Sequence, residues 1–141
     1  MALAQTLTTS FKVELARAIH NFSAAGDLFK IALYTANASL GADTTVYTTV
    51  GECSGPGYTA GGLELTNITP VSSGTTAYWS FDNITFPNVT LVTNGALIYN
   101  ASRNDRSVCV LNFGSNVTKV NQDLVITFPP LGATSAILRI E

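Results

Sequence analysis

The stretch LFKIALY, residues 28–34, decides the fold of this chain. From residue 29 onward every second side chain is Phe, Ile or Leu, and this two-residue repeat is typical of a β-strand. Two later runs, Ala96–Tyr99 and Val108–Leu111, are apolar at every position, which predicts central strands covered on both faces. One cover would be an opposing sheet, and the other would be either a helix or a neighbouring subunit.

One helix is expected before this stretch. The apolar residues between positions 11 and 22 recur at helical spacing. Ser10 precedes them as an N-cap residue, and Gly26 follows as a helix stop, because glycine readily adopts the left-handed conformation that closes a helix. The pattern predicts a helix over residues 10–23, preceded by an extended, uncharged arm over residues 1–9.

Short runs rich in β-branched and aromatic residues fill the rest of the chain, separated by turn residues. With no helical pattern between them, they indicate an antiparallel β-sandwich, jelly-roll-like, in a single domain over residues 1–141 whose strands occupy 28–141. The expected strands are 44–50, 63–69, 77–81, 89–93, 96–100, 108–113, 124–128 and 136–140. The strongest turn signals are Gly55-Pro56-Gly57, Ser72-Ser73-Gly74, Asn94-Gly95, Arg103–Arg106 and Pro129-Pro130.

Composition excludes several function classes. Only 11% of the residues are charged, 46% are hydrophobic and the net charge is −2, so the chain lacks the basic surface that binds nucleic acid or an anionic membrane. No apolar run approaches the roughly 20 residues of a membrane helix, and the first residues lack the pattern of a secretion signal. We therefore expect a soluble chain in which Cys53 and Cys109 are free thiols.

The residue types that carry chemistry are sparse. His20 is the one histidine, and no cluster with metal-ligand spacing surrounds it. Most acidic residues adjoin turns, where their side chains bond to local backbone. We therefore expect no enzyme activity, no metal and no cofactor. Tyr78 and Trp79 are consecutive, so in a strand they point to opposite faces and at most one of them lies in the core.

Several sequence motifs span nearly the whole chain. They are FKVEL at 11–15, HNF at 20–22, FKIALYT at 29–35, GYTAGG at 57–62 and GALIYN at 95–100. Together they resemble motifs of small virion structural proteins encoded by tailed bacteriophages, and they mark a fold more than a mechanism. The resemblance implies a capsid decoration or cement protein on the capsid surface, made in the bacterial host cytoplasm. Its implied partners are the major capsid protein and copies of itself, in a homo-oligomer such as a trimer.

Two functions follow as hypotheses. In the first, the chain binds and stabilises an assembled phage head, and Thr6 and Thr8 belong to an arm that reaches a neighbour by strand addition. In the second, it is a tail-associated or adhesin-like module that binds host-surface glycans by stacking Tyr58 or Trp79 on sugar faces. These four residues are the contact candidates that the sequence offers.

Overall fold

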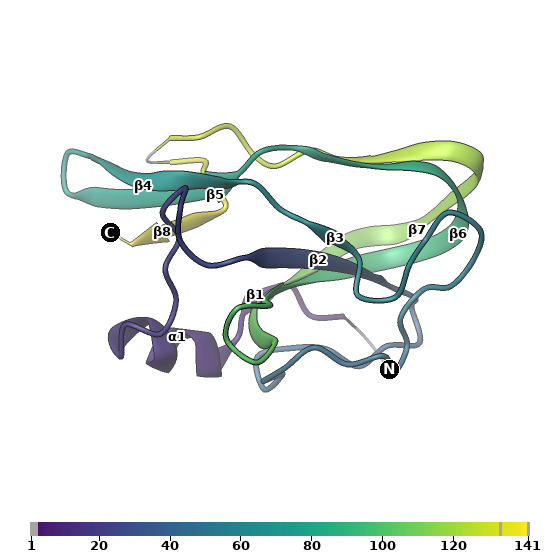
Figure 1. Ribbon diagram of the computed structural model, residues 1–141, viewed down its shortest axis with the longest axis horizontal. Helices are drawn as coiled ribbons and strands as arrows, with labels where there is room; N and C mark the ends of the chain where they lie inside the picture. The colour runs from purple at the N-terminus through teal and green to yellow at the C-terminus, as the bar shows by residue number, and fades with distance from the viewer. Residues whose placement is uncertain (1–2, 133, 141) are drawn as a thin grey trace.

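Two antiparallel sheets form the molecule in the computed structural model, which describes residues 3–132 and 134–140 (Figure 1). The larger sheet has the strand order β1-β7-β6-β2-β3, and the smaller has the order β4-β5-β8. The predicted mainly-β sandwich with one N-terminal helix is confirmed. The elements are β1 (Thr6–Leu7), α1 (Thr9–Ala16), β2 (Phe29–Tyr34), β3 (Leu63–Glu64), β4 (Asn67–Ser73), β5 (Thr76–Phe81), β6 (Ile84–Asn100), β7 (Arg106–Ile126) and β8 (Leu138–Ile140).

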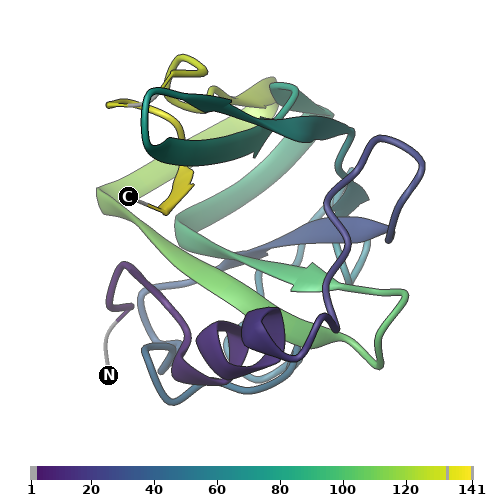
Figure 2. The same ribbon diagram turned by 90° about the vertical axis from the view of Figure 1, so that its left-hand side faces the viewer.

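The two longest strands, β6 and β7, pair with each other from Ile84↔Ile126 to Asn100↔Arg106. Several register shifts interrupt this ribbon, and Asn88 and Asn121 adopt left-handed backbone conformations within it. Bulges of this kind bend strands and increase their twist. The ribbon accordingly curls from the lower layer into the upper one at the right of Figure 1, and the same bend is visible in Figure 2.

The strand boundaries differ from expectation where the ribbon runs through predicted breaks. The expected strands 89–93 and 96–100 are one strand, β6, so the predicted turn at Asn94-Gly95 is wrong. Likewise, 108–113 and 124–128 join largely within β7, and 44–50 contributes only an isolated bridge at Val46. The turn at 103–106 lies at the loop between β6 and β7, as expected.

Helix α1 is shorter than the predicted 10–23. Its N-cap is Thr8 and not Ser10, because the Thr8 hydroxyl oxygen accepts a hydrogen bond from the Phe11 N–H at 3.3 Å. The helix ends at Ala16 in a Schellman motif, in which Ala18 is left-handed and the Ile19 N–H bonds to the Glu14 carbonyl oxygen. Because alanine occupies the position usually held by glycine, no stop signal marks this end of the helix in the sequence.

The main core lies between the sheets, where Phe29 of β2 and Phe81 of β5 meet with ring centroids 5.7 Å apart. Phe22, from the segment after α1, stacks on Phe29 at 4.3 Å. The second face of β2, β6 and β7 is also buried. Its cover is the chain's own N-terminal segment and the loop after β2, represented by Leu3 and Leu40. The central strands are thus apolar on both faces, as predicted, but the second cover is neither of the two alternatives expected from the sequence.

Within residues 3–132 and 134–140, no helix has the length and apolar character needed to cross a membrane.

Candidate functional site

The outer edge of β7 is open along most of its length. Strand β1 pairs with this edge at Cys109 and Val110, and the Thr8 N–H bonds to the Val108 carbonyl oxygen. The Asn112 side chain donates a hydrogen bond to the Leu3 carbonyl oxygen beside them. From residue 113 to 126, β6 is the only strand that pairs with β7 among the described residues. An open edge presents unpaired N–H and C=O groups, which form a template for pairing with another chain.

A groove of about 440 Å³ runs beside this open edge. It lies between the two halves of the bent strand. Its apolar lining consists of the core residues Leu124 and Ile126, of Phe113 and Val117 at the core margin, and of the exposed Val125. Its lining residues are Phe113, Val117, Lys119, Asp123, Leu124, Val125, Ile126 and Thr127.

Two charged residues, Lys119 and Asp123, stand in this groove. They are the only charged residues between Arg106 and Arg139. They form no ion pair with each other, and Lys119 has no hydrogen-bond or ionic partner among the described residues. Asp123 Oδ1 accepts a hydrogen bond from the backbone N–H of Asn88 at 2.9 Å, and no other described residue bonds to this carboxylate.

The outer face of the same ribbon carries exposed valines. Val92, Val120 and Val125 are 45%, 60% and 54% exposed, whereas their neighbours Leu91 and Leu124 are buried in the core. Strand β6 contains no charged residue. We call the three valines, with the exposed Thr85 and Thr118, the valine face. Removing water from such a surface costs little free energy, and the cores of protein interfaces are depleted of charged residues.

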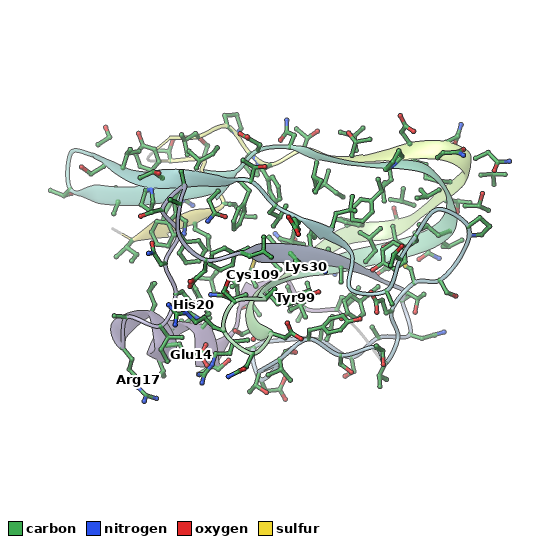
Figure 3. All side chains as sticks on the ribbon, in the orientation of Figure 1. Glu14, Arg17, His20, Lys30, Tyr99 and Cys109 are labelled. Carbon is green, nitrogen blue, oxygen red and sulfur yellow. The ribbon has the colours of Figure 1, made fainter. Side chains whose placement is uncertain are left out.

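A buried polar cluster surrounds His20, at the opposite end of the ribbon (Figure 3). The sequence placed His20 in the helix, but it follows the helix, and its side chain has no exposed surface. Its Nε2 donates to Glu14 Oε1 at 2.9 Å, and its Nδ1 accepts from Asn100 Nδ2 at 3.0 Å. Since both ring nitrogens have partners, the imidazole joins the end of α1 to the end of β6.

Two arginines complete this cluster. Arg106 donates to Glu14 Oε2 at 3.0 Å, and Arg103 donates to Asp27 Oδ2 at 3.3 Å. Burial of Asp27 opposes its ionisation, but hydrogen bonds from Asn100 and from the Asn21 N–H, together with Arg103, hold its pKa below the usual value. The cluster is hydrogen-bonded throughout, and its role is to fix the α1 end of the molecule.

A second polar cluster holds the loop between β2 and β3. The Glu52 carboxylate accepts hydrogen bonds from the hydroxyls of Tyr47 and Tyr58 and from the Gly61 N–H. Tyr99 stacks on Tyr47 at 4.8 Å. Neither cluster is a metal site, since the described residues contain no group of three or more potential His, Cys, Asp or Glu ligands.

The four contact candidates from the sequence lie apart from the open edge or are engaged within the chain. Thr6 belongs to β1 and pairs with Val110, and Thr8 is fully buried as the helix cap. The arm, in its described part from Leu3 onward, therefore lies along its own β7. Trp79 is 5% exposed and is therefore the core member of the Tyr78–Trp79 pair, whereas Tyr78 is half-buried.

Tyr58 is half-buried, packs against the core and donates its hydroxyl hydrogen to Glu52. Both cysteines are free and buried, as predicted. Sequence reasoning missed Lys119 and Asp123. The signal was available, because they are two isolated charges in a long uncharged segment, but the bend that places both in one groove depends on bulges that leave no clear sequence pattern.

Comparison with known proteins gives no match: no family model, no curated protein and no solved structure corresponds to this chain. The resemblance to phage structural proteins therefore rests on the motifs quoted above.

Proposed function

We propose that this chain is a virion structural protein that binds an assembled phage head, as a capsid cement or decoration protein. The observation that supports it best is the valine face, an uncharged apolar surface on the bent end of a rigid ribbon. Interfaces need such a surface, since few charges must be desolvated when it is covered. The resemblance of the motifs to phage proteins supplies the class of partner.

The expected effect on the stability of the phage head follows from thermodynamic linkage between binding and assembly. A subunit that binds only the assembled lattice stabilises that lattice by mass action, and this requires a rigid contact surface but no chemical step. The sandwich provides the rigidity, because the ribbon that carries the valine face is part of the same core as both sheets.

The glycan-binding alternative has less support. Stacking on a sugar requires an exposed aromatic face, whereas Trp79 lies in the core and the Tyr58 hydroxyl is bonded to Glu52.

The test is co-sedimentation of purified protein with phage heads that lack it, followed by cryo-electron microscopy of the decorated heads. Val92→Lys places a charge on the valine face and should reduce head binding by about tenfold or more. The matched control is Val71→Lys, at a valine that is also 45% exposed but lies in β4 of the smaller sheet, and this variant should bind as the wild type does. Absence of the wild-type protein from the head fraction, or density confined to the tail, would overturn the proposal.

A further inference from the structure

We propose that the open edge of β7 binds the same edge of a second copy of this chain, across a two-fold axis close to Asn121. The contact would use the groove and the strand edge, whereas head binding would use the valine face. The two surfaces meet at Val125, which lines the groove and also belongs to the valine face. Lys119 and Asp123 lie in the groove alone, and Val92 lies on the valine face alone, so substitutions there test the two contacts separately.

The strand edge is already suited to strand addition. Strand β1 adds to it in antiparallel register, with Thr6 opposite Val110 and Leu7 opposite Cys109. Immediately beyond this pairing the edge continues without a partner strand among the described residues. The bulge at Asn121 interrupts the edge, so the contact would consist of two short segments and the side chains between them.

The groove beside the edge is incompletely filled. Phe113 and Val117 are half-buried at the margin of the core and line the groove together with the buried Leu124 and Ile126. A second copy would cover this apolar surface and remove it from water, which favours association in proportion to the area buried.

The charges in the groove identify the occupant as a second copy. In a two-fold contact each residue i meets residue j of the partner, and j meets i. An axis near Asn121 places Lys119 of each copy opposite Asp123 of the other, because the two residues lie two positions on either side of it. Neither charge has an ionic partner among residues 3–132 and 134–140. Two reciprocal ion pairs would therefore form, and they would fix the register of the contact.

Sedimentation velocity of the purified protein, without phage heads, tests this inference. The mass should rise with concentration from 14.8 kDa toward twice that value. Lys119→Glu and Asp123→Lys should each weaken association by about tenfold or more, because each sets like charges opposite one another. An equimolar mixture of the two variants should associate again. In the mixed dimer the two substituted side chains, now of opposite charge, would face each other, and the native Asp123 of one copy would face the native Lys119 of the other.

The controls are Lys12→Glu in α1 and Asp43→Lys in the loop after β2, which make the same changes in net charge at exposed residues that do not line the groove. They should associate as the wild type does. Because Asp123→Lys also loses the bond to Asn88, Asp123→Asn is measured beside it, since an amide oxygen can keep that bond while the charge is removed.

A wild-type protein that stays at monomer mass up to about 1 mM would overturn the inference. So would folded single variants that associate normally, or a mixture that stays monomeric. A monomer that still binds heads would leave the proposed function standing, and a dimer that binds no heads would reject the proposed function alone.

Discussion

Tyr58 donates its hydroxyl hydrogen to Glu52 Oε2 at 2.5 Å, and its hydroxyl oxygen accepts the N–H of Leu33 at 3.0 Å. One phenol thus joins the carboxylate at the centre of the loop to the backbone of β2. The Tyr47 hydroxyl donates to the other carboxylate oxygen, Oε1, at 2.6 Å. The Gly61 N–H, at the far end of the loop, donates to Oε2 at 2.8 Å. A single acidic side chain therefore links three points of the long connection between β2 and β3.

Glu52→Gln should lower the free energy of unfolding by about 2 kcal/mol. The hydroxyls of Tyr47 and Tyr58 and the Gly61 N–H would lose a charged acceptor, and one of these donors would face an amide N–H group. Urea unfolding at pH 7 measures this change. Glu64→Gln is the control, since Glu64 is exposed in β3 and has no side-chain hydrogen bond among the described residues. Equal stability of the two variants would show that Glu52 does not order the loop.

Stability should fall at alkaline pH. Burial, with the nearby carboxylates of Asp105 and Glu52, raises the pKa of Tyr99 to about 12. Burial likewise raises the pKa values of Tyr34, Tyr47 and Tyr58. Unfolded tyrosine titrates near pH 10. The folded state therefore retains protons that the unfolded state releases, and its stability declines as the pH rises from about 10 through 12.

Urea unfolding at pH 8, 10 and 11 measures this decline, with absorbance at 295 nm following phenolate formation. Tyr99→Phe removes one of the contributing groups and should make the decline shallower. A free energy of unfolding that stays constant between pH 8 and 11 would contradict the expectation.

The N-terminal segment should be needed for folding, apart from any contact with a neighbour. Thr8 caps α1 through Phe11 and accepts a hydrogen bond from the Ser107 hydroxyl at 2.9 Å. Thr8→Ala should therefore cost about 1–2 kcal/mol, measured as a shift in the urea midpoint. Thr9→Ala, at the exposed next position, should cost much less. If Thr8→Ala were as stable as Thr9→Ala, the cap would contribute nothing to stability.

Sequence patterns predicted the parts of the fold that follow from local chemistry. The alternation at 29–34 indicated β2, the apolar runs indicated the centres of β6 and β7, and the turn signal at 72–74 indicated the hairpin between β4 and β5. They failed where tertiary contacts override local preference. Gly95 looks like a turn residue beside Asn94, but long-range pairing with β7 holds it in a strand. The open edge could not be predicted, since strand order is not a local property.

Gly95 lacks a side chain for a steric reason, which a substitution can test. A Cβ atom there would lie 2.2 Å from the Leu111 carbonyl oxygen and 2.7 Å from the Leu3 Cδ1. Gly95→Ala should therefore force β6 and β7 apart and cost about 3 kcal/mol. Gly74→Ala is the control: a Cβ there meets no atom within 4 Å, and its left-handed backbone costs only about 1 kcal/mol. A smaller effect at Gly95 than at Gly74 would refute this explanation.

The two thiols should be unreactive in the folded protein. Burial raises the pKa of Cys109 to about 12, and burial also raises the pKa of Cys53, whose thiol donates to the Val92 carbonyl oxygen at 3.2 Å. Because the thiolate is the reactive form, neither residue should react with a disulfide reagent at pH 8 until the chain unfolds. Two thiols should then react without prior reduction. Ser73→Cys, in the exposed hairpin after β4, should react at once in the folded state. Rapid labelling of the folded wild type would mean that the ribbon or the covering loop opens readily, whereas no labelling after unfolding would indicate a disulfide.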